Sequence, residues 1–466
     1  NTSILKIRNS ANNAWINLFT LAGGISSPID GTINSISIGK GANSVAGNTV
    51  LGESALDAAV TGGNNTAIGQ DVLTDNTSGN ANTAVGYTAL GNNTTGTSNT
   101  AMGQNSLLTN TTGSSNSAYG LQSLYSNTTG QYNVAVGRNA LYYNTTASNN
   151  VAVGYNALLS NTTATQNTAI GVSALLENTT GNYNTALGSY ALDANTTGSN
   201  NTGVGRNALS AATTASNNTA VGYNSTRQTT TGDSNVAVGN GTLDANTTGS
   251  SNTAIGRQAL TSNTTGAKNN ALGNEALEAN TTANYNDAFG YQALHVNTTG
   301  SQNCAFGWQT LKDNTTNNGN SGFGYAVLWK NTTGQNNTSI GNSSLQQNTT
   351  ASNNTAVGAY ALTAVTTGTE NTGLGLKAGY SITTGDNNVC IGNKAGQGQV
   401  TTGSDQLYLA RSSGAAGTAS VWVHGQSDGS CIQGDNTTAW SQTCDRRLKK
   451  NIVDSPKGLA EIDQLR

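Results

Sequence analysis

A glycine recurs every 17 residues, without one insertion, from Gly52 to Gly392. The residues around it recur as well. In one copy, residues 82–90 read Asn-Thr-Ala-Val-Gly-Tyr-Thr-Ala-Leu, and residues 93–96 read Asn-Thr-Thr-Gly. A fixed short period indicates a solenoid, in which each repeat is one coil stacked on its neighbours. The first seven copies of this glycine are Gly52, Gly69, Gly86, Gly103, Gly120, Gly137 and Gly154.

The composition excludes several classes of protein. Charged residues make up 9% of the chain, against about 25% in ordinary domains. A polar, weakly charged chain could be disordered, but disorder does not need an apolar residue at one fixed phase. The net charge of −3, without a basic stripe, argues against nucleic acid as a partner. No apolar run of about 18 residues suggests membrane insertion.

The four cysteines predict neither a metal site nor a disulfide scaffold. They lie far apart and include no Cys-x-x-Cys pair, so a zinc site is not expected. Cys390 stands where most copies have alanine, and we therefore expect it to be a small, buried apolar residue. We expect no cofactor and no bound metal.

Each coil has a regular pattern of apolar and small residues. The residue before the glycine is apolar, the one before that is small, and leucine follows four places later in most copies. Because neighbours in a strand face opposite sides, we expect Val85, Leu90 and Leu294 inside, with Ala84 and Gly86 outside. Two short strands and two turns of the Asn-Thr-Thr-Gly type fit 17 residues, whereas these residues disfavour a helix.

The predicted fold is therefore an all-β, parallel β-solenoid or β-roll of 17-residue coils. A coil this short encloses a thin interior, so the small outward face suggests close packing between identical chains. We expect a homotrimer, although symmetry alone permits other numbers. Roughly 21 coils at about 4.8 Å each would give a rod on the order of 100 Å long. Thr226 replaces the repeated leucine and predicts a local defect in the core.

The repeat also resembles known fibres. The motif Asn-Thr-Ala-Val-Gly is similar to the head repeats of trimeric autotransporter adhesins, which are left-handed parallel β-rolls wound as trimers. Those repeats are usually shorter than this one, so the resemblance implies a shared architecture and nothing more. The related Asn-Thr-Ala-Ile-Gly copies of this chain also look like the repeat arrays of phage tail fibres. The resemblance covers residues 31–400 and implies a trimeric β-roll shaft.

The end of the chain resembles the start of an intramolecular chaperone auto-processing domain. Residues 444–452 read Cys-Asp-Arg-Arg-Leu-Lys-Lys-Asn-Ile, and residues 458–465 are expected to form a short helix. The resemblance implies a domain that trimerises the fibre and then cuts itself off before Asp445, with Cys444 as nucleophile and Lys449 as base. The family has serine at the first position. A thiol is the stronger nucleophile and a nearby lysine lowers its pKa; the alternative is a vestigial, uncleaved junction.

These observations divide the chain into four parts. We expect an N-terminal connecting segment with short strands over residues 1–30 and the shaft over residues 31–400. A β neck is expected over residues 401–443, and residues 444–466 are interpreted as the start of a truncated chaperone domain. Because the chain opens on Asn1, it is expected to be processed or a fragment.

The predicted function is that of a structural virion fibre: a bacteriophage tail fibre shaft that supports host attachment. Its partners would be its own copies, other tail or baseplate proteins, and a glycan or protein receptor on the host cell. The alternative is a bacterial trimeric surface adhesin, which would be expected to carry a heptad stalk and a membrane anchor. Apart from the single self-cleavage, no enzyme activity is expected, because a glycosidase needs paired carboxylates and the acidic residues are scattered.

The aromatic residues after the glycine and the Asn-Thr-Thr sites can each be interpreted in two ways. Aromatic residues that follow the glycine could stack on receptor sugars or pack between coils and chains. The Asn-Thr-Thr sites could be unmodified turns or, in a eukaryotic host, acceptors of N-linked glycans. The aromatic residues at this position include Tyr87, Tyr155, Tyr223, Tyr291, Trp308 and Tyr325.

Overall fold

The computed structural model describes residues 36–410 continuously. It also describes strands within Ser3–Arg8, Trp15–Leu21, Gly31–Ile33, Val421–Gly425 and Cys431–Gln433, together with Ser427. The chain forms two compact units, Asn1–Ala283 and Asn284–Arg466, and each contains its own stack of coils. No helix among the described residues is long and apolar enough to cross a bilayer.

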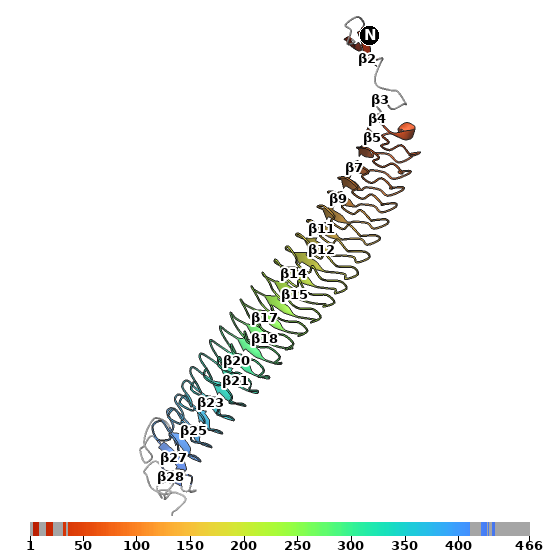
Figure 1. Ribbon diagram of the computed structural model, residues 1–466. Coiled ribbons are helices and arrows are strands. Elements are labelled where there is room, and N and C mark those ends of the chain that lie inside the picture. Colours follow the sequence, from red (N-terminus) through yellow and green to blue (C-terminus); the bar gives the residue numbers. More distant parts are fainter. Residues whose placement is uncertain are drawn as a thin grey trace, which may run out of the picture. The chain divides into compact units, whose positions relative to one another are not determined.

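Unit 1 is a stack of parallel three-residue strands, one per coil (Figure 1). From β5 to β18 each strand pairs in parallel with the equivalent residues 17 positions later; Thr83 lies opposite Thr100, for example. Before the stack, β1 pairs antiparallel with β2, and β4 pairs antiparallel with both β3 and β5. The elements of unit 1 are β1 (Ser3–Arg8), β2 (Trp15–Leu21), β3 (Gly31–Ile33), β4 (Ile36–Gly39), η1 (Ala42–Ser44), β5 (Thr49–Gly52), β6 (Thr66–Ile68), β7 (Thr83–Val85), β8 (Thr100–Met102), β9 (Ser117–Tyr119), β10 (Val134–Val136), β11 (Val151–Val153), β12 (Thr168–Ile170), β13 (Thr185–Leu187), β14 (Thr202–Val204), β15 (Thr219–Val221), β16 (Val236–Val238), β17 (Thr253–Ile255) and β18 (Asn270–Leu272).

Unit 2 continues the same pattern and ends in an antiparallel cap. Its strands pair in parallel from β19 to β26, and β27 and β28 then add antiparallel strands beyond β26. The segment 401–443, expected as a neck, thus begins with a strand that still pairs in the coil stack. The strands of unit 2 are β19 (Asp287–Phe289), β20 (Cys304–Phe306), β21 (Ser321–Phe323), β22 (Thr338–Ile340), β23 (Thr355–Val357), β24 (Thr372–Leu374), β25 (Val389–Ile391), β26 (Leu407–Ala410), β27 (Val421–Gly425) and β28 (Cys431–Gln433).

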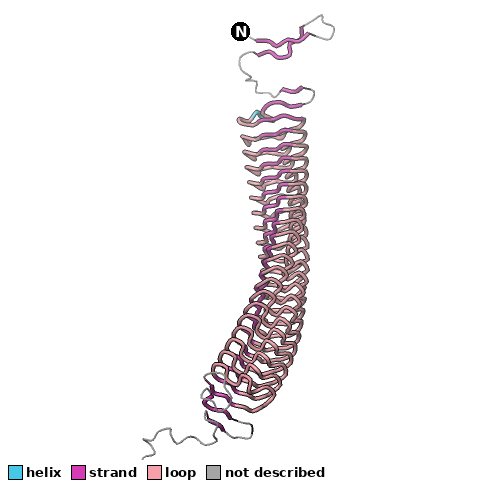
Figure 2. The backbone as a smooth tube through the Cα atoms, turned by 90° about the vertical axis from the view of Figure 1, so that its left-hand side faces the viewer, coloured by secondary structure: helices cyan, strands magenta, loops and turns pink. Residues whose placement is uncertain are grey.

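The predicted fold class is confirmed. The chain is an all-β parallel β-solenoid of about 21 coils with 17-residue repeats and almost no helix. One detail differs, because the described coils carry one short strand each rather than two. Within each unit, Figure 2 shows the strands in a column on the coils, with turns making up the rest of each coil.

The repeated glycine is required for two physical reasons. Gly154 has a φ of +139°, in a region that residues with a side chain rarely adopt. A Cβ atom at this position would also lie 2.3 Å from the carbonyl oxygen of Gly171 in the next coil. The same holds at Gly86, where a Cβ would lie 2.7 Å from the carbonyl group of Gly103. The coils stack at this distance because no side chain stands between them.

The interior of each coil holds leucine and alanine. Leu90 and Leu294 are fully buried, as predicted, and so is Ala84. Val85 is half-buried on the outer side, so the expectation that it fills the interior is wrong. Between the end coils, the leucine row crowds the strand centre: a Cβ atom at Gly373 would lie 2.8 Å from Cγ of Leu362. Alternation then turns Val85 outward once Ala84 is inside.

Two rows of buried asparagines complete the interior. In the first row, the backbone N–H of Asn99 donates to Oδ1 of Asn82 at 3.0 Å, and Nδ2 of Asn82 donates to the carbonyl of Gly96 at 2.9 Å. In the second row, Nδ2 of Asn93 donates to Oδ1 of Asn76 at 2.8 Å and to the carbonyl of Gly96 at 3.0 Å. Because of these rows, the polar groups in the thin interior are hydrogen-bonded from one coil to the next.

The asparagine rows bear on the Asn-Thr-Thr sites. Asn93 is the asparagine of such a site, and it is fully buried with its side-chain nitrogen bonded inside the coil. A glycan on that nitrogen would replace one of its two N–H groups, which both donate hydrogen bonds, and would not fit in the buried interior. The structure therefore favours unmodified turns at these positions.

The coil that contains Thr226 departs from this pattern, in line with the predicted defect. Thr226 is buried with a φ of +50°, and its Oγ1 has no hydrogen-bond partner. A β-branched residue with this backbone conformation is an outlier. In the same coil Thr229 replaces an asparagine of the second row and accepts a hydrogen bond from Nδ2 of Asn246 at 3.1 Å.

Candidate interaction surface

The outward side of the strands carries a continuous row of apolar side chains in unit 1. We call the residues that directly precede the repeat glycine in β6–β18 the apolar stripe. Their exposed fractions reach 45% at Leu187 and 41% at Met102. The members of the apolar stripe are Ile68, Val85, Met102, Tyr119, Val136, Val153, Ile170, Leu187, Val204, Val221, Val238, Ile255 and Leu272.

The apolar stripe is large for a surface that faces water. Seven of its 13 members expose at least 36% of their surface. A contiguous exposed apolar row is unusual on a monomer and is typical of a surface that contacts another molecule.

Three successive coils of unit 2 carry aromatic side chains on the same side of the strands. Phe289, Phe306 and Phe323 precede the glycine, and their rings stack at centroid distances of 4.3 and 5.2 Å. A second row follows the glycine, where Trp308 lies 4.6 Å from Tyr325 and 6.3 Å from Tyr291. These six residues together are called the aromatic block: Phe289, Tyr291, Phe306, Trp308, Phe323 and Tyr325.

The aromatic residues predicted to face a receptor do face outward. Tyr87, Tyr155 and Tyr223 lie in unit 1 and each exposes 47–48% of its surface. Tyr291 and Trp308 expose 42% and 40% but also stack on each other. Parallel stacking covers ring faces and leaves ring edges outward, so these two rings pack between coils, as one of the two interpretations predicted, and contact with a receptor stays a prediction.

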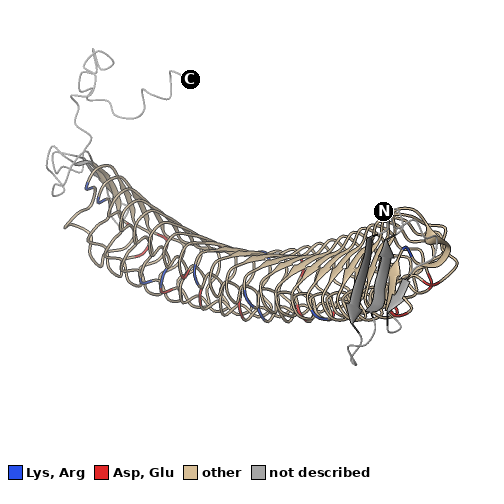
Figure 3. Ribbon diagram, turned by 90° about the horizontal axis from the view of Figure 1, so that it is seen from above, with Lys and Arg blue, Asp and Glu red and all other residues tan. Residues whose placement is uncertain are grey.

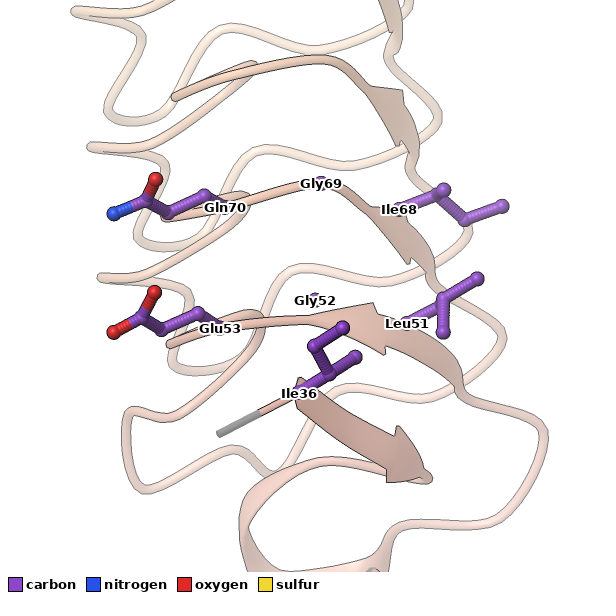
Figure 4. Close-up of a pocket in the computed structure, with 7 residues that line it drawn as sticks. All are labelled: Ile36, Leu51, Gly52, Glu53, Ile68, Gly69 and Gln70. Atoms are coloured by element: carbon purple, nitrogen blue, oxygen red, sulfur yellow. The ribbon is translucent and has the colours of Figure 1, made fainter. Parts of the chain in front are cut away.

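A shallow hollow lies beside the first coils of unit 1 (Figure 4). Its volume is about 430 Å³. Leu51 and Ile68 line one end, Glu53 and Gln70 the other, and two repeat glycines lie between them. The hollow is open and its lining is mostly apolar, so it offers no converging polar groups of the kind that orient a small substrate.

Charged residues are scattered over the coils (Figure 3), and some of them form ion pairs. In one pair, the guanidinium of Arg227 donates to both carboxylate oxygens of Asp244 at 2.9 and 3.2 Å. Burial raises the pKa of Asp193 to about 6, and the neighbouring charge of Glu177 adds to the shift. Oδ1 of Asp193 has no hydrogen-bond partner. This carboxyl group is a local cost to folding at neutral pH.

The cysteines of the coils are inert in this structure. Cys390 is fully buried, as predicted, and burial raises the pKa of its thiol to about 12. Burial and the charge of Asp287 raise the pKa of Cys304 as well. Both thiols are free. A thiol with a raised pKa is a poor nucleophile at neutral pH.

The last described coil is closed by aromatic packing. Tyr408 lies opposite Cys390, at a position that is alanine in most coils, and its ring stacks on His424 at a centroid distance of 4.1 Å. Nε2 of His424 lies 2.9 Å from Oε1 of Gln406. These larger side chains cover the end of the interior, which neither pattern nor composition had indicated.

The predicted self-cleavage residues Cys444, Asp445 and Lys449, and the helix expected over residues 458–465, lie outside the described residues. Most of the N-terminal segment does as well. The structure thus aligns the repeat glycines in one row and the buried leucines in another, and it places the aromatic residues on the outside. Sequence reasoning missed the apolar stripe as an outward feature, although the unbroken apolar residue before each glycine was its signal.

Comparison of the chain with models of protein families finds no match, and comparison with curated proteins finds none either.

Proposed function

We propose that the chain is the shaft of a trimeric fibre on a virus particle, of the phage tail fibre type, which supports attachment to the host cell. The observation that carries this proposal is the apolar stripe, which places one apolar side chain on the same outward row in every coil of unit 1. A solenoid coil whose interior is already hydrogen-bonded and filled has no internal need for that row. A contact with an identical chain would give each member of the stripe an equivalent partner.

Other properties support a structural role. The side chains of the interior bond to their counterparts one coil away, so the stack holds itself together without a ligand. The outward row keeps an apolar residue in every coil from β6 to β18, which suits a contact between identical chains related by rotational symmetry. The sequence resemblance to trimeric β-roll fibres supplies the number three. Ala84, expected on a small outward face, is in fact interior, so the proposed self-association uses the apolar stripe instead.

The remaining parts of the proposal follow from the resemblance. The fibre would be located on the virion, bind other tail or baseplate proteins at one end, and carry or support contact with a host glycan or protein. Its C-terminal chaperone segment would promote trimerisation and then cleave before Asp445. The residues concerned, Cys444 and Lys449, are assigned from the sequence motif.

The first experiment measures the mass of the native assembly and of its chains. Light scattering on the purified complete gene product should give three chains per particle, and Val153→Asp, which charges the apolar stripe, should reduce this number. Thr163→Asp, a charge at an exposed turn residue of the same unit, is the matched control and should leave the trimer intact. A wild-type protein that is monomeric would contradict the proposal.

The second experiment separates the virion fibre from the bacterial adhesin. Antibodies against the repeat should label the tails of purified virus particles in electron micrographs. Intact mass spectrometry should show a chain that ends at Cys444 in the wild type and an uncut chain in Cys444→Ala. Labelling confined to a bacterial envelope would support the adhesin instead.

A further inference from the structure

A repetitive interface has a weakness that the apolar stripe illustrates. Apart from Tyr119, the members of the stripe are valine, isoleucine, leucine or methionine, and they lie in register from coil to coil; Val136, for example, pairs with Val153. If one chain of a fibre slid by one coil, each member would meet a residue much like its original partner. Repetitive contacts therefore specify register weakly, and proteins restore it with exceptional residues at single positions.

The aromatic block is such an exception in unit 2. The four coils that follow it have isoleucine, valine or leucine before the glycine, in β22–β25. The block differs from them in both outward rows over three consecutive coils. Even the third outward position changes there, because Asp287, Cys304 and Ser321 stand where most strands begin with threonine or valine.

The rings of the block form rigid stacks. The two pairs of phenylalanine rings are within 10° of parallel, and Trp308 and Tyr325 are within 4°. Phe323 exposes 38% and Tyr325 exposes 50% of their surfaces. A stack of this kind cannot adapt by rotating one ring without losing contacts with its neighbours.

A slip of one coil would place this stack against the wrong partners. Phe323 of one chain would face the level of Ile340 in another, and Trp308 would face a level occupied by tyrosine. Large and small side chains would then be mismatched at the ends of the block, which leaves voids on one side and overpacking on the other. A slip elsewhere along an aliphatic row produces no comparable mismatch.

We propose that the aromatic block sets the axial register between chains of the fibre. The inference rests on the proposed trimer, and it assigns the block to contact with a second copy of this chain. On this view the block acts where the apolar contacts alone would permit sliding.

The test uses cysteine pairs one coil apart. Val357 and Leu374 lie opposite each other in paired strands of successive coils, on the outward row beyond the block. Full-length chains carrying Val357→Cys and a size tag are co-expressed with untagged chains carrying Leu374→Cys. Cys304, Cys431 and Cys444 are changed to serine in both. A short thiol cross-linker then yields like-with-like dimers from aligned chains and mixed dimers from chains that slipped by one coil.

The block is then replaced by residues typical of the other coils. The variant carries Phe289→Val, Phe306→Val, Phe323→Val, Tyr291→Asn, Trp308→Asn and Tyr325→Asn. We expect like-with-like dimers to exceed mixed dimers at least tenfold with the native block, and the two to come within threefold of each other in the variant. The matched control removes the single tyrosines of unit 1 through Tyr87→Asn, Tyr155→Asn and Tyr223→Asn, and should keep the native ratio.

Light scattering and thermal melts accompany each sample. A block variant that stays trimeric and folded but keeps the native cross-link ratio overturns the register proposal while leaving the trimer intact. A monomeric native-block protein overturns the proposed fibre itself and the register proposal with it. A change of ratio in the tyrosine control equal to that of the block variant would also refute a specific role for the block.

Discussion

The inside and the outside of the coils follow different rules, as two neighbouring asparagines illustrate. Asn150 is fully buried: its Nδ2 donates to the carbonyl of Ala164 at 2.9 Å, and its Oδ1 accepts from the N–H of Asn167 at 2.9 Å. Asn149 is exposed, and the equivalent position in other coils holds Tyr132 or Gln166. The repeat is preserved where a side chain bonds to the next coil, and it varies where a side chain faces outward.

The outward rows show what that freedom is used for. In unit 1 the residue before the glycine varies among valine, isoleucine, leucine, methionine and tyrosine but is apolar in every coil from β6 to β18. In unit 2 the same position becomes phenylalanine over three coils. Variation that keeps one chemical property is the pattern expected of the contact surface that we propose.

A charge placed inside should have the largest effect. Leu294 is fully buried, so Leu294→Asp would bury a carboxylate without a partner at a cost of more than about 3–5 kcal/mol. We expect loss of the folded protein or a large fall in melting temperature, measured by circular dichroism. Val357→Asp on the outward row is the control and should leave the coil structure of a chain intact. Equal melts for the Leu294 variant and the wild type would contradict its interior position.

Removal of one asparagine from the first row should have the next largest effect. Asn150→Ala leaves the N–H of Asn167 without its partner, while the carbonyl of Ala164 keeps the hydrogen bond from Nδ2 of Asn161. A buried unpaired group costs about 1–3 kcal/mol, and chemical denaturation should show a loss of this size if the stack unfolds cooperatively. Asn149→Ser introduces the residue found at the same position of other coils, as at Ser98 and Ser115, and should change stability little. Similar losses in both variants would erase the distinction between inside and outside.

Repair of the irregular coil should stabilise the protein moderately. Thr226→Leu restores the buried leucine row and removes a hydroxyl that has no partner, for a gain of about 1–2 kcal/mol. The melting temperature should rise. Thr231→Leu, which adds the same side chain at an exposed position of the next turn, should give no such gain. A destabilised Thr226→Leu would indicate that this coil is shaped for its threonine.

The smallest effect should depend on pH. The pKa of Asp193 is raised from 3.8 to about 6 because burial disfavours the charged form. The folded state therefore holds the proton more tightly than the unfolded state does. The stability that this proton provides is complete below pH 3.8 and is lost as the pH rises through about 6. Asp193→Asn should raise the melting temperature at pH 7.5 and have little effect at pH 3.5. An equal shift at both pH values would assign the effect to packing instead.

The sequence and the structure agree where one residue type alone satisfies a position. The repeat glycines could be predicted because their period has no exception, and the positive φ at Gly154 explains why. Leu90, Leu294 and Cys390 were placed inside by their own hydrophobicity and by comparison between copies. The predicted defect at Thr226 followed from the same comparison.

The candidate surface could be predicted in part. The outward position of Tyr87, Tyr155 and Tyr223 was one of two interpretations, and the stacking within the aromatic block was the other. The apolar stripe was assigned to the wrong side, and the burial of the asparagine rows was not predicted. In each case a local pattern has two geometrically equivalent solutions, and a single coil does not contain the information to choose between them.

By itself the sequence determined the coil length, the need for glycine, the leucine row and the all-β class, because a strict period leaves few ways to stack a chain. Only the tertiary structure decided which of Ala84 and Val85 faces inward. Alternation along a strand allows either residue to face inward, provided that the other faces outward. The closed coil has a narrow interior, which accepts the alanine and leaves the valine on the outside.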